Sequence, residues 1–317
     1  MNILKNILDT TQIDGPYFLR NAVLYTLHDT RQTIHDPPPR FITLEAGRQE
    51  NRIKMKELSP MSIHSVEICN NSESPLFLLD GEICCAGYQD RIVVTSGLIR
   101  KHTSKIVPVA CVESGRSTGS SANFLPDSTL AFPSLRAEVA SSLSRDGNTA
   151  QVTINQEKIW EYVAKSLATL HIQSNTQSIH DLYEQKKTDI VRYAGTASLK
   201  KGMRGYICGI GNGMALDIFD SGLFGMLHQK LINSYVIEAL LHSSEMTNPS
   251  EVSTIEKWLE NIASVSAVQT YRGVDMGKNL RIEGNGIIGS GLILDRQIIS
   301  FSLYDHVTAK NKGQVYN

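Results

Sequence analysis

The sequence has few of the features that mark membrane, secreted or nucleic-acid-binding proteins. None of its 317 residues fall in a run near the roughly 18 apolar residues that a membrane-spanning helix needs. Lysine and arginine total 31 against 32 acidic residues, so the basic excess typical of general nucleic-acid binding is missing. The N-terminal segment MNILKNILDTTQID is too polar for a signal peptide. We therefore expect a cytoplasmic protein with no membrane partner and no general nucleic-acid partner.

Cysteine is also scarce. The chain has five cysteines, an odd number, and Cys84 and Cys85 are adjacent, which does not suit a disulfide framework. No CxxC spacing is present, so the usual zinc signature is missing as well. We expect most of the thiols to be reduced and buried, because free cysteine packs as a small hydrophobic residue. The sequence identifies no cofactor.

The first half of the chain is typical of β-structure. Short apolar or alternating runs are separated by Gly, Asn, Ser and Pro. This spacing predicts a compact antiparallel sandwich or barrel. The predicted strands are residues 41–44, 62–69, 75–79, 92–98 and 105–112. Residues 115–127 are rich in Ser, Gly and Asn and predict a surface loop, either a lid over a site or a simple connection.

Helices and hairpins are predicted in the second half. Helical spacing indicates a helix over residues 155–170, another over 224–240, a third that begins after the cap Ser178, and a fourth that begins at residues 249–251. Residues 206–219 and 287–303 predict hairpins. The fold class is therefore α+β, with a β-rich half over residues 1–127 and a half of helices and hairpins over 128–317. We expect the two to form one integrated unit.

The glycines at 209, 211 and 213 have the spacing GxGxG and lack the full dinucleotide-binding pattern GxGxxG. The residues after them look like a strand, whereas a pyrophosphate site needs a helix N-terminus there. Asn-Gly also favours a type I′ hairpin turn. We therefore interpret this segment as a turn.

Two segments concentrate charged side chains at predicted strand ends. Residues 79–91 read LDGEICCAGYQDR, and residues 108–116 read PVACVESGR. If neighbouring strands bring these ends together, Glu82 and Glu113 can serve as general acid and base. Glu82, Asp90 and Glu113 can alternatively hold a hard cation, while Arg91 and Arg116 suit a phosphate or a carboxylate. The competing interpretation is a structural network of buried ion pairs.

A nucleophilic triad is a weaker hypothesis. Cys111 needs a histidine partner among His64, His102 and His180, and none lies at a diagnostic spacing. Ser114 precedes Gly115, but the surrounding residues do not form a GxSxG elbow.

The same two segments resemble a bacterial family named for its association with ADP-ribosylglycohydrolases and rhodanese-type phosphatases. LLDGE at residues 78–82, GYQDR at 87–91 and IVPVACVESGR at 106–116 look like the family pattern LLDGE, GAKQNR and IPVSCVEQGRW. The resemblance extends from FITLEA at residues 41–46 through PSLR at 133–136 to the closing hairpin. Asp90 stands where the family usually has Asn, and Ser117 where it usually has Trp.

The resemblance implies a role in bacterial conflict systems that use ADP-ribose and related nucleotides, with defence against phage as the expected setting. It supplies no catalytic residues. A binding protein that senses or sequesters an NAD-derived or ADP-ribose-like nucleotide is the first hypothesis. A hydrolase of such a ligand that uses Glu82 and Glu113 is the second, and a structural partner of a toxin or effector is the third. The candidate ligand-binding residues are Gln89, Asp90, Arg91, Arg116 and Arg136.

Overall fold

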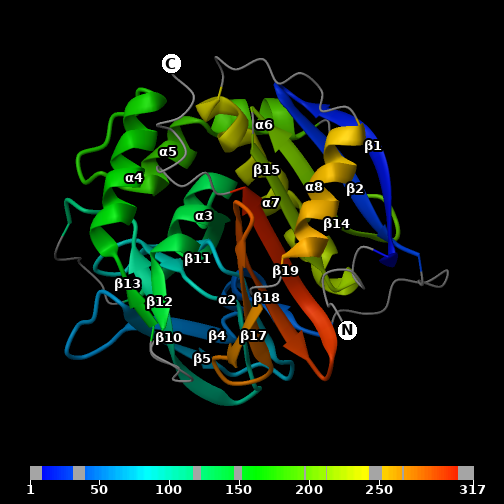
Figure 1. Cartoon of the computed structure of the whole chain (residues 1–317). Helices are drawn as coiled ribbons and strands as arrows, with labels where there is room; N and C mark the ends of the chain where they lie inside the picture. The colour runs from blue at the N-terminus through cyan, green and yellow to red at the C-terminus, as the bar shows by residue number, and fades with distance from the viewer. Residues whose placement is uncertain are drawn as a thin grey trace.

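The computed structural model describes residues 9–30, 40–116, 123–145, 152–195, 198–211, 213–242, 252–265 and 268–305. These residues form a mixed α+β fold in which an eight-stranded sheet and a nearly closed six-stranded sheet pack with seven helices (Figure 1). The predicted fold class is confirmed. In the described part of the chain, no helix combines the length and the apolar character needed to cross a bilayer.

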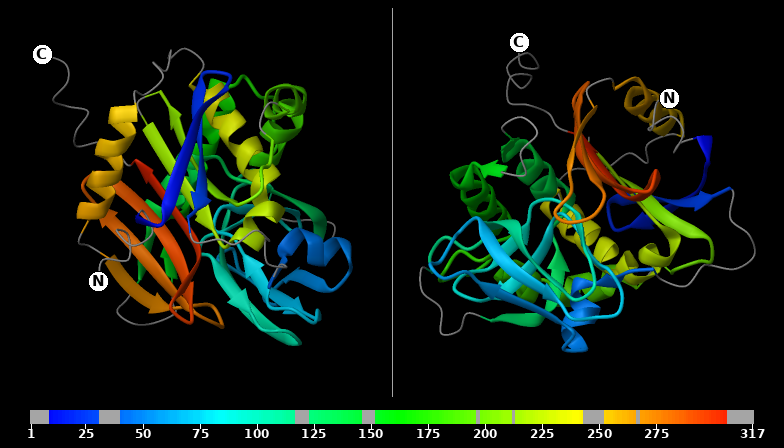
Figure 2. Two further views of the ribbon diagram at one scale, coloured as in Figure 1. Left: turned by 90° about the vertical axis from the view of Figure 1, so that its right-hand side faces the viewer. Right: turned by 90° about the horizontal axis from the view of Figure 1, so that it is seen from below.

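The eight-stranded sheet is antiparallel throughout. Its strands, in spatial order, are β1 (Thr11–Leu19), β2 (Ala22–Asp29), β14 (Met203–Ile210), β15 (Gly213–Phe219), β19 (Gln297–Asp305), β18 (Ile287–Leu294), β17 (Lys278–Gly284) and β16 (Val268–Arg272). The β1–β2 hairpin, which the sequence patterns did not predict, lies beside β14 (Figure 2, left). The first strands of the chain therefore complete a sheet built by the C-terminal half.

Both faces of this sheet are covered by helices. Successive side chains of a strand point to opposite faces, and Tyr206 packs in the cluster with α7 (Ser221–Leu241) while Ile207 packs with α8 (Val252–Ser264). The β14–β15 hairpin pairs Ile210 with Gly213. Gly211 has a φ of +57°, so the glycine-rich segment is a turn as predicted. Asn212 lies outside the described residues.

The six-stranded sheet is barrel-like. Its order is β11 (Phe124–Leu130), β7 (Glu82–Ala86), β8 (Arg91–Val93), β10 (Thr103–Cys111), β5 (Ser65–Asn70) and β4 (Ile53–Glu57). An isolated bridge between Lys56 and Asn123 joins its two edges, so the sheet nearly closes on itself. The interior is mainly apolar and includes Val66, Val107 and Val109. A separate small sheet consists of β3 (Ile42–Thr43), β6 (Leu76–Leu78) and β9 (Gly97–Ile99). Helix α2 (Leu44–Gln49) begins directly after β3.

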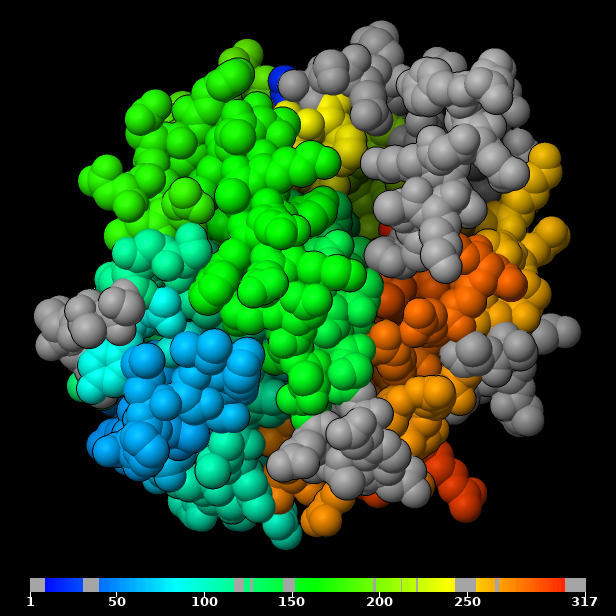
Figure 3. Space-filling model, turned by 60° about the vertical axis from the view of Figure 1, so that its left-hand side comes forward, coloured from blue at the N-terminus to red at the C-terminus, as the bar shows by residue number. Residues whose placement is uncertain are grey.

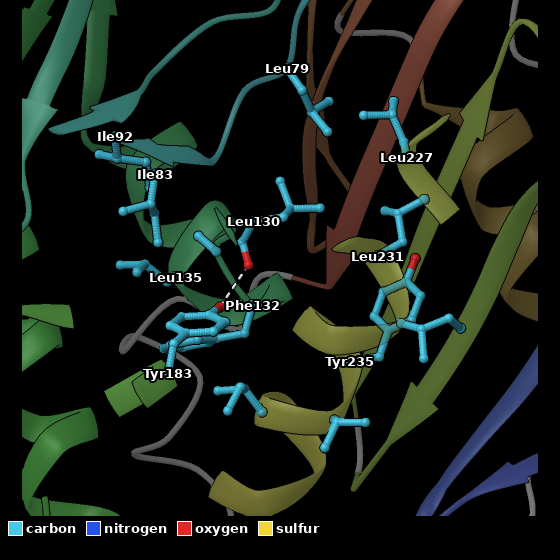
Figure 4. Packing of buried hydrophobic residues seen from close by; sticks show 14 of the residues in the cluster. Leu79, Ile83, Ile92, Leu130, Phe132, Leu135, Tyr183, Leu227, Leu231 and Tyr235 are labelled. Carbon is cyan, nitrogen blue, oxygen red and sulfur yellow. Dashed lines mark hydrogen bonds between the residues drawn. The ribbon is translucent and has the colours of Figure 1, made fainter. Parts of the chain in front are cut away.

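The remaining helices connect the two sheets. They are α3 (Pro133–Ser142), α4 (Gln156–Thr169), α5 (Ile179–Gln185) and α6 (Lys187–Ala194), with the short pair β12 (Leu143–Arg145) and β13 (Val152–Ile154) between α3 and α4. Helix α3 contacts β18 and β19, α4 contacts α3 and β10, and α5 and α6 continue from α4 to α7. One apolar cluster runs from Ile83 in the six-stranded sheet to Tyr235 in α7, and Tyr183 of α5 donates a 2.6 Å hydrogen bond to the Leu130 carbonyl inside it (Figure 4). The two sheets and these helices therefore share one core. On the surface, segments of the first half of the chain (blue and cyan), the central helices (green) and the last strands (orange) lie side by side (Figure 3).

The local predictions succeed where capping and turn chemistry are strong. The predicted helix over 155–170 is α4, and Ser178 accepts a hydrogen bond from the His180 N–H at the start of α5. The predicted strand over 41–44 is wrong beyond Thr43, because the Thr43 side chain caps α2 and ends the strand. The loop predicted over 115–127 also ends early, since Phe124 begins strand β11, which pairs with β7. Residues 117–122 and 249–251 lie outside the described residues.

Candidate functional site

The two charged segments of the sequence meet at one end of the six-stranded sheet. The loop between β7 and β8 carries Gln89 and Asp90, and Glu113 follows β10, which pairs with β8. The Asp90 N–H donates to the Glu113 carboxylate at 3.0 Å, and the Gln89 side chain donates to the backbone carbonyls of Glu113 and Arg116. The polar groups of both segments therefore form one network, the signature cluster: Gln89, Asp90, Arg91, Glu113 and Arg116.

Two carboxylates in the signature cluster share one guanidinium. Arg116 Nε lies 2.9 and 3.0 Å from the two Glu113 oxygens, and its Nη2 lies 2.7 Å from Glu113 and 3.4 Å from Asp90. Both carboxylates are almost fully buried, whereas 28% of the Arg116 side chain is exposed. The arginine therefore covers the pair on the solvent side.

The pKa values of the two carboxyl groups move in opposite directions. Burial raises the pKa of Asp90 despite a hydrogen bond from Ser178. Burial also acts to raise the pKa of Glu113, but hydrogen bonds from Arg116, Thr176 and the Asp90 N–H outweigh it and lower that pKa. Environments that move the pKa values of two neighbouring carboxyl groups apart are typical of acid–base pairs.

Arg91 lies inside the six-stranded sheet with a fully buried side chain. It donates from Nη2 to both oxygens of Glu57, at 3.0 and 3.2 Å, and from Nη1 to the Gln89 side-chain carbonyl at 3.2 Å. Glu57 is only 1% exposed, so the charges neutralise each other in a bidentate pair. Arg91 orients Gln89 and closes the barrel interior.

Glu82 belongs to a second network. Its carboxylate accepts hydrogen bonds of 2.7 Å from Lys230 of α7 and from Ser128 of β11, and Lys230 also pairs with Glu45 at 3.0 Å. Burial alone would lower the pKa of Lys230, but the two carboxylates outweigh burial and raise it. Glu82 is thus a partner of a charged lysine that links the barrel to helix α7.

Strand register separates Glu82 from Glu113. Cys84 of β7 and Cys111 of β10 both lie beside Arg91, and the two strands run in the same direction because each is antiparallel to β8. Glu82 precedes Cys84 by two residues and Glu113 follows Cys111 by two, which is about 13 Å along the strands at about 3.3 Å per residue. Acid and base carboxylates of glycosidases are about 5 to 9.5 Å apart. In this conformation the two glutamates do not face one bond.

The same separation of Glu82 from Glu113 applies to the alternative in which Glu82, Asp90 and Glu113 hold a hard cation. Glu82 is turned towards Lys230, and the position between Asp90 and Glu113 is filled by the Arg116 guanidinium. In the part of the chain that the structure describes, no group of three or more His, Cys, Asp or Glu side chains is arranged to hold a metal ion.

Arg136 lies in a third network, beside the eight-stranded sheet. Its Nη1 lies 3.0 and 3.2 Å from the two oxygens of Asp217, and its Nη2 donates to Ser302 at 2.9 Å. Tyr235 of α7 donates a further 2.7 Å bond to Asp217. The adjacent cavity has a volume of about 30 Å³, which suits one or two waters at roughly 10–15 Å³ each and no larger ligand.

A cysteine–histidine contact is present that the spacing did not reveal. Cys85 Sγ lies 3.3 Å from His180 Nδ1, whereas Cys111 Sγ donates to the Glu113 carbonyl at 2.9 Å. Cys85 is only 5% exposed, and burial strongly raises the pKa of its thiol. A thiol in this state is not an activated nucleophile.

A groove of about 820 Å³ crosses β4 and β5 beside α2. This volume is within the range of small-molecule sites, about 300 to 1,000 Å³. Its walls come from separate segments that carry no motif, so no sequence pattern indicated it, although the FITLEA segment at residues 41–46 lies just before Arg48 in the chain. The lining includes Arg48, Lys54, Lys56, Asn71, Asn123 and Phe124.

Nearly the whole chain matches one family of known proteins. A search of curated proteins and a search of solved structures each gave no match. The family model described as the ARG and Rhodanese-Phosphatase-superfamily-associated Protein domain matches residues 10–304 and so spans both sheets and all the networks described above. The chain belongs to the family of ARG and Rhodanese-Phosphatase-superfamily-associated proteins.

Proposed function

We propose that the protein binds an NAD-derived or ADP-ribose-like nucleotide, which it senses or sequesters as a component of a bacterial conflict system. The family is associated with ADP-ribosylglycohydrolases, enzymes whose substrates carry ADP-ribose. The nearly neutral charge of the chain also suits a small anionic ligand better than a polyanion.

The observation that carries the proposal is the exposure of Arg116. Arg91 and Arg136 are 0% and 1% exposed, while Arg116 is 28% exposed at the edge of the signature cluster. Its Nη1 has only a long contact, 3.5 Å, to the Gly87 carbonyl. In the proposal Arg116 contacts a ligand phosphate, Gln89 and Asp90 hold its loop, and Arg91 and Arg136 support the surrounding structure.

A hydrolase is the second candidate, and the opposite pKa shifts of Asp90 and Glu113 favour it. In that case Asp90 would act as the acid and Glu113 as the base, with Arg116 between them. Glu82 would then act through Lys230 and Ser128 on the protein structure and not on the bond that breaks.

Thermal unfolding with NAD, ADP-ribose, cyclic ADP-ribose and mononucleotides tests binding, and mass spectrometry of each mixture tests turnover. A ligand present at 100 times its dissociation constant adds about 2.7 kcal/mol of stability. The Arg116→Gln variant should lose this stabilisation. Arg100→Gln is the matched control, since Arg100 is also a surface arginine paired with a carboxylate, that of Asp275.

Each outcome has a distinct meaning. Stabilisation by an intact ligand that Arg116→Gln removes and Arg100→Gln retains supports the proposal. New product masses that disappear in Glu113→Gln would make the protein a hydrolase. No stabilisation and no product with any of the nucleotides would overturn the proposal and direct the search to a toxin or effector partner.

A further inference from the structure

Arg48 has an unusual environment for a buried arginine. The residue is 6% exposed, and its Nη1 and Nη2 are buried without a hydrogen-bond partner. At a similar depth, Arg91 forms three hydrogen bonds to a carboxylate and Arg136 forms two. A buried charged donor without a partner loses its hydration and gains nothing in return, so it is costly unless something else occupies the site.

The other charged groups that act on Cys84 are Glu82 and Lys230, and they pair with each other. Lys230 already lies between Glu82 and Glu45, at 2.7 and 3.0 Å. Burial raises the pKa of the Cys84 thiol to about 12, and both the charge of Arg48 and its contact with this thiol oppose that rise. A structural role as a distant counter-charge for the two glutamates is therefore the alternative to a ligand site.

The groove beside Arg48 has the composition of an anion site. Lys54 is exposed on its wall, and Lys56 pairs with Glu67 at 2.9 Å. The amide side chains of Asn71 and Asn123 line the same groove. Glu67 also lines the groove, so three cations and several amides face one carboxylate around an open volume of about 820 Å³, a composition that suits a phosphorylated small molecule.

We propose that this groove binds the phosphate or diphosphate group of a small molecule, and that Arg48 is its principal cation. Turning the guanidinium towards the groove gives up only the weak contact with the Cys84 thiol, because Nη1 and Nη2 form no hydrogen bond to an oxygen acceptor. Two charge-assisted hydrogen bonds to the phosphate then replace two unpaired donors. The site is separate from the signature cluster. It rests on the function proposed above only for the identity of the ligand.

Inorganic pyrophosphate is the probe, measured by calorimetry and by thermal unfolding, with sodium chloride of equal ionic strength as the salt control. Arg48→Met keeps the length of the side chain and removes its charge. It should weaken pyrophosphate binding roughly 10-fold or more, as expected for a lost charge-assisted hydrogen bond. Its melting temperature without ligand should be equal to or higher than that of the parent chain. Arg52→Met is the matched control, because Arg52 is an exposed arginine that pairs with Glu50.

A second variant keeps the test decisive if Arg48→Met does not fold. Lys54 is exposed, so Lys54→Glu should fold normally and weaken pyrophosphate binding several-fold by placing a negative charge on the groove wall. Unchanged pyrophosphate binding in either folded variant would overturn the proposal. So would a lower melting temperature of Arg48→Met, because it would show that Arg48 is a structural counter-charge.

The outcome also separates this site from the function proposed above. If pyrophosphate binds through Arg48 and no nucleotide binds, the groove is an anion site and the nucleotide function fails. If nucleotides bind through Arg116 while pyrophosphate does not bind at all, the groove proposal fails and the nucleotide function stands. Binding of an RNA or DNA oligonucleotide in place of pyrophosphate would also overturn the small-molecule proposal.

Discussion

The six-stranded and the eight-stranded sheet each depend on a buried arginine, but the two arginines connect different parts of the molecule. Arg91 of β8 pairs with Glu57 of β4, so both partners belong to the six-stranded sheet. Arg136 of α3 pairs with Asp217 of β15, and its Nη2 lies 3.9 Å from Asp80, just before β7. The first pair holds one sheet closed, whereas the second joins a helix to both sheets. Although the two ion pairs have the same chemistry, the loss of one should destabilise a single sheet and the loss of the other should destabilise both.

The strongest test of this comparison is Arg136→Met. Asp217 would remain buried without its cation, and breaking such a pair typically costs about 3 to 5 kcal/mol. Hydrogen exchange should speed up in both sheets, because the pair connects them. Chemical denaturation measures the loss of stability. Faster exchange confined to α3 would contradict the connecting role of Arg136.

Arg91→Met should cost a similar amount, about 3 to 5 kcal/mol, by leaving Glu57 buried and unpaired. Here faster hydrogen exchange should be confined to the six-stranded sheet, while β14 and β15 keep their protection. The double variant Arg91→Met, Glu57→Met should recover much of the loss, since apolar residues can replace a buried pair. No recovery in the double variant would mean that the hydrogen bond from Arg91 to Gln89 matters more than the charge.

Asp90→Asn should have a smaller effect with the opposite sign. The folded pKa of Asp90 is raised, so the ionised carboxyl lowers stability once the pH exceeds its unfolded value of about 3.9. Asparagine removes this cost and keeps one acceptor oxygen for the Ala86 N–H, while its NH2 group can donate to the Ser178 hydroxyl. We expect a gain of about 1 kcal/mol near neutral pH. The gain should shrink as the pH falls towards about 4.

Thermal unfolding of both proteins across this pH range measures the difference. A loss of stability in Asp90→Asn at every pH would contradict the expectation. It would mean that the ionic contact with Arg116, at 3.4 Å, outweighs the burial of the Asp90 carboxylate.

The smallest loss of stability is expected for Asp275→Asn, which removes an ion pair between the loop before β17 and the segment around β10. Asp275, in the loop between β16 and β17, pairs with Arg100 at 2.8 Å and with Lys105 at 3.0 Å. These hydrogen bonds lower the pKa of Asp275, so their contribution is present above about pH 4 and is lost progressively as the pH falls below that value. Because both cations are partly exposed, Asp275→Asn should cost at most about 1 kcal/mol. The loss should shrink in high salt, and a salt-independent loss would point to the bond from the Arg100 N–H instead.

Local chemistry made several elements predictable. Ser178 was identified as a cap because a hydroxyl before a helical run satisfies a free N–H, and it does so for α5. Asp295 and Arg296 form the turn of the closing hairpin with positive φ angles of 49° and 65°. The β1–β2 hairpin was not predicted. Its strand β2 is nearly all buried, so it lacks the polar–apolar alternation by which a strand is recognised.

The candidate site was only partly predictable. The sequence indicated that the ends of β7 and β10 carry related groups, and strand order does bring Asp90 and Glu113 together. It also suggested that Glu82 belongs with them, but the register places that carboxylate beside Lys230, which is 148 residues away in the chain. Nothing in the spacing indicates such a partner.

By itself the sequence determined the fold class, most helices and hairpins of the second half, and a cluster of charged groups at two strand ends. These depend on neighbours within a few residues, where periodicity, caps and turns act directly. Only the tertiary structure decided the fate of each buried arginine. Arg91 meets Glu57, Arg136 meets Asp217, and Arg48 meets no hydrogen-bond partner at its Nη atoms. Strand order and helix packing decide which side chains come within hydrogen-bond distance of each arginine. An arginine that meets a buried carboxylate has a structural role, whereas one that meets none can bind a ligand.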